Sequence, residues 1–240
     1  MKKLQVLLFA FLFAITGTYA QKVEDIIDKH IEALGGSTNL ANLKSAQIDA
    51  TVSVASFSVK GTTTVLQNKG IRIEQEVQGM KMIQAFDGTT GWAINPMLDN
   101  ANPVKLPESQ NANLKGQMDL TGLYNYKAKG YQVELIGEKQ VKDEPVYVLK
   151  VTMADGNAAT NYISKKTFLT LRTWIHMTTE NGDVVESNIY PSDYRKVDGI
   201  VTPYSIQIEG TGIPGTIVTN ITSVRYNLDI DPSIFAFPEN

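Results

Sequence analysis

The chain of 240 residues contains no cysteine, which excludes disulfides, thiol nucleophiles, thiolate metal sites and lipid attachment through an N-terminal cysteine. It has only two histidines, His30 and His176, and neither belongs to an H-E-x-x-H or similar ligand cluster. We therefore expect no metal and no cofactor. With 22 Lys+Arg against 25 Asp+Glu, the net charge of −3 gives no reason to bind nucleic acid or an anionic membrane.

Long apolar runs are also missing beyond the N-terminus, so we predict no integral membrane segment in the mature chain. At the N-terminus itself, a basic pair precedes an apolar stretch from Leu4 to Ile15, and Thr18 and Ala20 occupy the positions that signal peptidase reads. An uncleaved anchor would need ~18–20 apolar residues. The pattern predicts a signal peptide at 1–20, cleaved after Ala20, and a periplasmic mature chain.

Catalytic motifs are scarce, since neither G-x-S-x-G nor S-x-x-K occurs. The segment Gly210–Gly215 matches the G-x-G-x-x-G spacing, but Pro214 and a β-rich stretch follow where a helix would be needed, which favours a turn. Glu74 and Glu76 fall on one face of a predicted strand, a spacing that suits an exposed face as well as an acid/base pair. We expect a protein that is not an enzyme.

What is present is mostly β pattern, preceded by a helix. Apolar residues recur at helical spacing from Val23 to Leu34, Gly35-Gly36 ends that helix, and Ser37–Leu43 predicts a second short turn. No linker or repeat divides the rest, so 21–240 is predicted to be a single domain.

Strand patterns cover most of the remaining sequence, with turn signals such as Asn68-Lys69-Gly70 and Gln78-Gly79 between them. Two short helices are predicted in the intervening segment, at Glu108–Leu114 and Gln117–Tyr126. Roughly ten or eleven antiparallel strands must curl to cover an apolar face. We predict a mainly β (α+β) fold, in which a strongly curved antiparallel sheet forms an unclosed β-barrel with helices covering its concave face. The strands are expected at Ile48–Phe57, Ser58–Gln67, Ile71–Gln78, Met80–Phe86, Trp92–Ile94, Tyr131–Val141, Pro145–Met153, Ala158–Ser164, Leu169–Met177, Val184–Tyr190, Ile200–Glu209 and Thr216–Tyr226.

Apolar residues suited to a hydrophobic cavity gather in one short stretch. Methionine adapts to irregular ligands, although it fills ordinary cores as well. In Leu169–Met177 the alternation predicts Leu171 and Ile175 on one face and Trp174 and His176 on the other. The apolar stretch suited to a cavity comprises Met80, Met82, Phe86, Trp92, Ile94, Met97 and Leu98.

Two segments resemble periplasmic outer-membrane lipoprotein-sorting proteins, the LolA/LolB-like carriers. An arginine-bearing strand with Arg72 is followed by Asp87-Gly88, Trp92 and Pro96, which is similar to the D-G-x-x-x-W-x-x-x-P hairpin of that family. The C-terminal segment Asp229–Pro238 is similar to its closing D-x-x-x-F-x-F-x-P motif. Ala33-Leu34-Gly35-Gly36 is more similar to an uncharacterised branch of the family.

The resemblance implies an unclosed β-barrel whose cavity shields a lipid or an acylated lipoprotein in transit to the outer membrane, with the envelope lipoprotein-transfer machinery as a further partner. Arg72 becomes a candidate polar anchor near the mouth, with a structural role as the alternative, and Ile73 joins the candidate cavity residues. A carrier of this kind needs no catalytic group.

A second hypothesis is a non-catalytic envelope interaction module that binds a protein or glycan partner. It would use the outer face of the sheet, where we expect Tyr124, Tyr126, Trp174 and His176. An enzyme with dispersed carboxylates is the third class.

Overall fold

The computed structural model describes residues 21–98, 100–178, 184–210, 212 and 214–239, so the predicted signal peptide lies outside the described residues. The helical elements are a helix at residues 21–33, α2 (Ser37–Ala41), α3 (Glu108–Gly116) and two 3-10 turns, η1 (Pro96–Leu98) and η2 (Pro232–Phe235). The strands are β1 (Ser45–Val54), β2 (Phe57–Leu66), β3 (Gly70–Val77), β4 (Met80–Phe86), β5 (Gly91–Asn95), β6 (Asn100–Lys105), β7 (Gln132–Val141), β8 (Glu144–Thr152), β9 (Ala158–Ser164), β10 (Thr170–Thr178), β11 (Val184–Val197), β12 (Ile200–Glu209) and β13 (Ile217–Tyr226).

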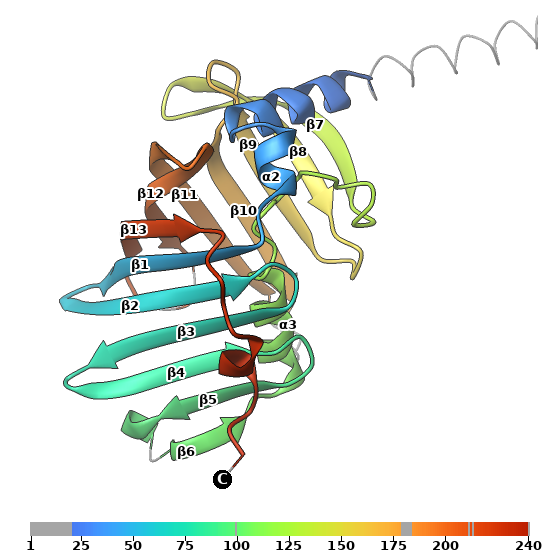
Figure 1. Cartoon of the computed structure of the whole chain (residues 1–240). Coiled ribbons are helices and arrows are strands. Elements are labelled where there is room, and N and C mark those ends of the chain that lie inside the picture. Colours follow the sequence, from blue (N-terminus) through green and yellow to red (C-terminus); the bar gives the residue numbers. More distant parts are fainter. Residues whose placement is uncertain (1–20, 99, 179–183, 211, 213, 240) are drawn as a thin grey trace, which may run out of the picture.

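All of these strands join one 13-stranded antiparallel sheet in the order β6-β5-β4-β3-β2-β1-β13-β12-β11-β10-β9-β8-β7 (Figure 1). The edge strands β6 and β7 do not pair with each other, so the curled sheet is an unclosed half-barrel, and the predicted fold class is confirmed. The rough prediction of ten or eleven strands was too low, and the twelve strand segments read from the sequence correspond to every strand but one. It missed β6, an edge strand that contains Pro103, and an edge tolerates a residue without an N–H.

The helix at 21–33 and α3 define what we call the inner face of the sheet. Ile26 and Ile27 pack against Leu149 and Ile163 of β8 and β9. The strand pairings connect the residues beneath the first helix with those beneath α3, near the other end of the strand order. Both helices therefore lie on the same face of the sheet. The expectation that helices cover this face is confirmed.

The opposite side, the outer face, is crossed by the C-terminal segment 228–239, which runs in front of β1–β5 in Figure 1 while α3 lies behind them. Phe235 is buried against the sheet, and its carbonyl accepts a hydrogen bond from Trp92 Nε1 at 2.8 Å. The carbonyl of Ile234 accepts another from Arg72 Nη1 at 2.9 Å. The segment therefore covers the apolar part of the outer face of β4 and β5.

Tight turns set the register of the hairpins. At the predicted Gln78-Gly79 turn, φ is 53° and 79°, the pair of positive values that a two-residue hairpin turn requires. Asn68 has φ of 55° and lies between β2 and β3, as its turn signal predicted.

The end of the first helix is docked onto the sheet by a backbone contact. Gly35 has φ of 121°, and a Cβ there would lie 2.2 Å from the carbonyl oxygen of Gly199, so only glycine fits. Val201 N–H donates to the carbonyl of Leu34 at 2.9 Å. This joins the helix to β12.

The remaining helix predictions gave mixed results. The helix predicted at Glu108–Leu114 is confirmed as α3, whereas Gln117–Tyr126 forms a series of turns, because its side chains are anchored individually to the core. Among the helices that the structure describes, none combines the length and hydropathy needed to cross a bilayer.

His30 makes the packing of the first helix dependent on pH. It is 6% exposed, and its Nδ1 donates to the carbonyl of Phe168 at 2.6 Å. Burial lowers the pKa of His30, while the Phe168 carbonyl raises it less, so the neutral ring is favoured in the folded state. The unfolded chain binds the proton more readily.

We therefore expect full stability above the ordinary histidine pKa of about 6.5 and a progressive loss as the pH falls below it. Urea unfolding at a series of pH values from about 7.5 to 5 measures this dependence. In His30→Gln the slope over this range should be smaller. An unchanged slope would assign the pH dependence to other groups.

Candidate functional site

Aliphatic side chains of the inner face continue beyond the part that the helices cover, and we call this region the inner apolar surface. Its residues are half-buried, apart from the buried Ile221, and only Ile73 belongs to the packing around a helix-covered core cluster. It extends over β4, β3, β2, β1, β13, β12, β11 and β10 in the order of the sheet. It comprises Ile48, Ala50, Val52, Val54, Val59, Ile73, Val77, Met80, Met82, Ile175, Ile189, Ile206, Ile208, Ile217 and Ile221.

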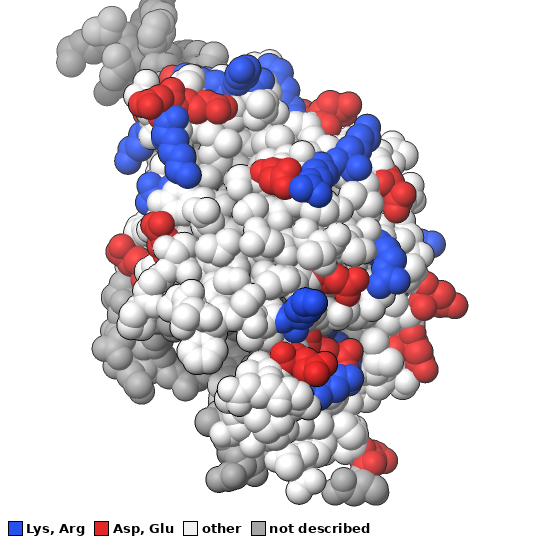
Figure 2. Space-filling model, turned by 90° about the vertical axis from the view of Figure 1, so that its left-hand side faces the viewer, with Lys and Arg blue, Asp and Glu red and all other residues white. Residues whose placement is uncertain are grey.

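The inner face of these strands is almost free of charge. In the described part of these eight strands, the only charged side chains on the inner face are Asp193 and Arg195, both on β11, which form an ion pair with each other. The outer face of the same strands carries alternating charges, including Glu74, which accepts from both Arg72 and Lys81. Figure 2, viewed from the side of the β1–β2 and β3–β4 turns, shows a broad uncharged area with charges along its right-hand edge and others at the top and upper left of the molecule.

Such an arrangement suits an apolar ligand. Burying apolar surface stabilises by roughly 25 cal/mol per Å², and aliphatic side chains that remain half-buried still have surface to cover. Contiguous apolar surfaces rimmed by polar residues are typical of binding sites. The inner apolar surface offers contact along several neighbouring strands without an ionic group to select a charged ligand. An extended hydrocarbon chain fits these properties.

Of the predicted cavity residues, Ile73, Met80, Met82, Phe86 and Ile175 face inward. Phe86 is 3% exposed and packs beneath α3, so it forms core. The other residues are half-buried members of the inner apolar surface. Their contact with a ligand stays a prediction.

Arg72, Trp92 and Ile94 face outward, away from the inner apolar surface. Successive residues of a strand point to opposite faces, so neighbours in the sequence such as Arg72 and Ile73 are separated by the sheet. Arg72 is held by Glu74 at 3.2 Å and by the Ile234 carbonyl, and its guanidinium lies 5.4 Å from the centre of the Trp92 ring. In this position Arg72 fastens the C-terminal segment rather than lining the inner apolar surface.

The remaining predicted residues lie elsewhere. A register shift between Thr170 and Arg172 turns Leu171 towards the outer cluster of Val146, Val148 and Tyr162, so it does not share a face with Ile175 as expected. Met97 is 50% exposed in η1, and the side chain of Leu98 lies outside what the structure describes.

Two tyrosines expected on the outer face are packed on the inner side instead. Tyr124 packs around the cluster of Leu40 and Ile200, and Tyr126 packs against the cluster beneath the first helix. This corrects the prediction, whose error was to treat the turn segment as a surface helix. Trp174 and His176 do lie on the outer face.

Sequence reasoning missed most of the inner apolar surface, including Val52, Ile206, Ile208 and Ile217. A usable signal was present, because 50–59 and 210–224 contain no charged residue and 50–54 alternates apolar with hydroxyl side chains. The alternation indicates strands, but the sequence does not say that these distant strands share one surface.

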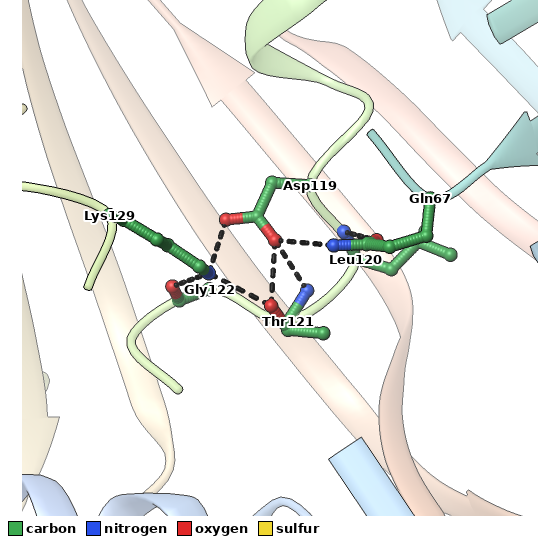
Figure 3. Close-up of polar contacts among 6 residues, drawn as sticks. All are labelled: Gln67, Asp119, Leu120, Thr121, Gly122 and Lys129. Atoms are coloured by element: carbon green, nitrogen blue, oxygen red, sulfur yellow. Dashed lines mark hydrogen bonds and ion pairs between the residues drawn. The ribbon is translucent and has the colours of Figure 1, made fainter. Parts of the chain in front are cut away.

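The turn segment 117–130 connects the covered regions of the inner face and is fixed by a polar cluster around Asp119 (Figure 3). Lys129 Nζ lies 2.6 Å from Asp119 Oδ2, and the Thr121 hydroxyl and Gln67 amide donate to Oδ1 at 2.7 and 3.1 Å. Burial raises the pKa of Asp119, but these donors outweigh it and hold the pKa below the usual range. The carboxylate thus stays ionised and holds the segment in place.

This geometry, an open curled antiparallel sheet with helices on its inner face, is a LolA-like fold, and the resemblance inferred from the hairpin and the C-terminal motif is confirmed at the level of the fold. A LolA superfamily protein from Nitrosomonas europaea superposes with a TM-score of 0.62 at 16% identity, over 89% of this chain and 97% of that chain.

Two further solved structures have the same fold over a similar share of the chain. A DUF1329 family protein from Desulfovibrio piger gives a TM-score of 0.59 at 16% identity, over 89% of this chain and 97% of its own. A domain described as an outer membrane lipoprotein-sorting protein from Vibrio parahaemolyticus gives 0.59 at 11% identity, over 90% and 97%. No protein-family model and no curated protein matches the sequence.

Proposed function

We propose that this chain is a periplasmic carrier that holds a lipoprotein acyl chain or another lipid on its inner apolar surface and takes part in outer-membrane lipoprotein sorting. The observation that carries the proposal is the half-buried, uncharged aliphatic surface that spans β4 to β10 on the inner face. The LolA-like fold supports it. Export through the segment 1–20, with cleavage after Ala20, would deliver a single domain of residues 21–240 to the compartment where a lipid needs an escort.

The energetics suit reversible binding without catalysis. Each acyl methylene removed from water contributes about 0.8 kcal/mol, so about ten of them give roughly 8 kcal/mol before entropic costs. A gross free energy of this size corresponds to about micromolar affinity. Cargo held in this way can be transferred to an acceptor without a bond being made or broken.

A charge placed on the inner face should weaken binding, whereas the same charge one residue away should not. We expect Ile206→Asp to lower the affinity for a fluorescent fatty acid and for a triacylated peptide about tenfold or more, because a carboxylate would lose hydration against the acyl chain. Ser205→Asp is the matched control, since Ser205 lies next to Ile206 on β12 but faces outward.

Fluorescence titration of the wild type and the two variants gives the dissociation constants, and circular dichroism checks that both variants fold. Equal losses in both variants, or no saturable uptake by the wild type, would contradict the carrier function.

A further inference from the structure

The outer face of β9 to β12 differs from the rest of the sheet because aromatic and amide side chains alternate there. Across these strands Thr160, Trp174, Asn188 and Glu209 lie in one row of paired residues. In the adjoining row Arg172 pairs with Tyr162, and Tyr190 pairs with Gln207. This surface lies on the opposite side of the sheet from the inner apolar surface and is independent of it.

Arg172 is held in a fixed orientation without a carboxylate partner. Its guanidinium lies 4.7 Å from the centre of the Tyr162 ring, and its Nε donates to Asn188 Oδ1 at 2.8 Å. Within the described residues no Asp or Glu oxygen lies within 4.0 Å of it, and its terminal nitrogens donate to no protein acceptor. A planar guanidinium fixed in this way is prepared to bind a carboxylate or phosphate through two parallel hydrogen bonds.

The side chain of Arg172 lines a groove of about 310 Å³, which we call the outer groove. Residues of the β7–β8 turn line one side of it, and Lys142 Nζ lies 5.7 Å from the centre of the Tyr190 ring. The amides of Gln140 and Gln207 and the carboxylate of Glu209 complete its polar lining. Pockets that hold small ligands have volumes of ~300–1,000 Å³, so a short segment of a polymer fits.

We propose that the outer groove binds an acidic saccharide, a glycan unit that carries a uronic-acid carboxylate. Arg172 and Lys142 would receive the carboxylate, and the amides and Glu209 match sugar hydroxyls, which both donate and accept hydrogen bonds. The ring of Tyr190 offers an apolar face to the C–H groups of a sugar. The glycan would fix the position of the carrier in the envelope without occupying its lipid surface.

Calorimetric titration of the purified protein with tetragalacturonic acid tests this assignment. The methyl ester of the same tetrasaccharide is the control ligand, because it keeps the sugar rings and lacks the negative charge. We expect saturable binding of the acid and about tenfold weaker binding of the ester, the loss that one charge-assisted hydrogen bond accounts for. Arg172→Gln should weaken binding of the acid by about the same factor. Fatty-acid binding should be unchanged.

Arg225→Gln is the matched control, because Arg225 lies on the outer face of β13 beside Asp49 and away from the groove. Lys142→Gln, in an exposed turn, repeats the test without disturbing the packing on Tyr162. No saturable binding of the acid, equal binding of the ester, or equal losses in Arg172→Gln and Arg225→Gln would each overturn the proposal.

Discussion

Replacing Phe235 by alanine should lower the free energy of unfolding by about 3–5 kcal/mol, the range for deleting a fully buried aromatic side chain. Phe235 is 1% exposed and fills the space over Gly70, where an added Cβ would lie 2.5 Å from the phenyl ring. The side chain anchors the C-terminal segment on the outer face, together with the contact of Phe237 with Trp92 and the hydrogen bonds that Arg72 and Trp92 donate to the carbonyls of Ile234 and Phe235. Urea unfolding followed by tryptophan fluorescence measures the loss.

Phe57→Ala is the matched control for this prediction. Phe57 is 68% exposed at the start of β2, so the same deletion should change stability by less than about 0.5 kcal/mol. Gly70→Ala should itself cost about 1–3 kcal/mol by overpacking, and less in the Phe235→Ala background, where the space is empty. Additive effects of the two substitutions would show that Phe235 does not occupy the space over Gly70 in solution.

Loss of the Asp119 carboxylate should have the second largest effect, about 2–4 kcal/mol in Asp119→Ala. The side chains of Asp119 and Lys129 are 17% and 19% exposed, so the substitution leaves the Lys129 ammonium largely buried without its counter-ion. It also removes the acceptor for Thr121 and Gln67. The turn segment 117–130 would detach from the sheet most readily at this point.

The Asp119 effect should depend on pH in a defined direction. Because the pKa of Asp119 is lower in the folded than in the unfolded chain, its contribution is complete above the unfolded value of about 3.9 and is lost as the pH falls through the folded value. The difference between wild type and Asp119→Ala in urea unfolding should therefore be constant from about pH 7 to 5 and shrink below about pH 4. Asp25→Ala, which breaks an exposed ion pair with Lys29, should leave the midpoint nearly unchanged at every pH. A difference that persists at low pH would assign the effect to packing.

The hairpins show what local sequence can predict. The Gln78-Gly79 turn and the strands beside it follow from a residue pair that tolerates positive φ and from alternation over a few residues, so their register depends only on near neighbours. The curled sheet also follows, because many alternating strands with few helices have one apolar face to cover. The LolA-like motif added the correct fold to this pattern.

The candidate site was predicted only in part, and the errors have one physical origin. Arg72 and Ile73 are adjacent in the sequence but lie on opposite faces, and the register shift beside Leu171 moved that residue away from Ile175. Alternation tells which residues share a face within one strand. It does not tell which face of a distant strand is continuous with it, since that depends on every pairing between them.

By itself the sequence determined the strand periodicity, most hairpin turns, the absence of thiol chemistry and the type of fold, because these depend on composition and on residues close together in the chain. The tertiary structure alone decided that Ile206 and Met82 belong to one uncharged surface while Arg72 and Trp92 hold the C-terminal segment on the other side. The reason is that a surface shared by β4 and β12 exists only after the strands between them have paired and the sheet has curled.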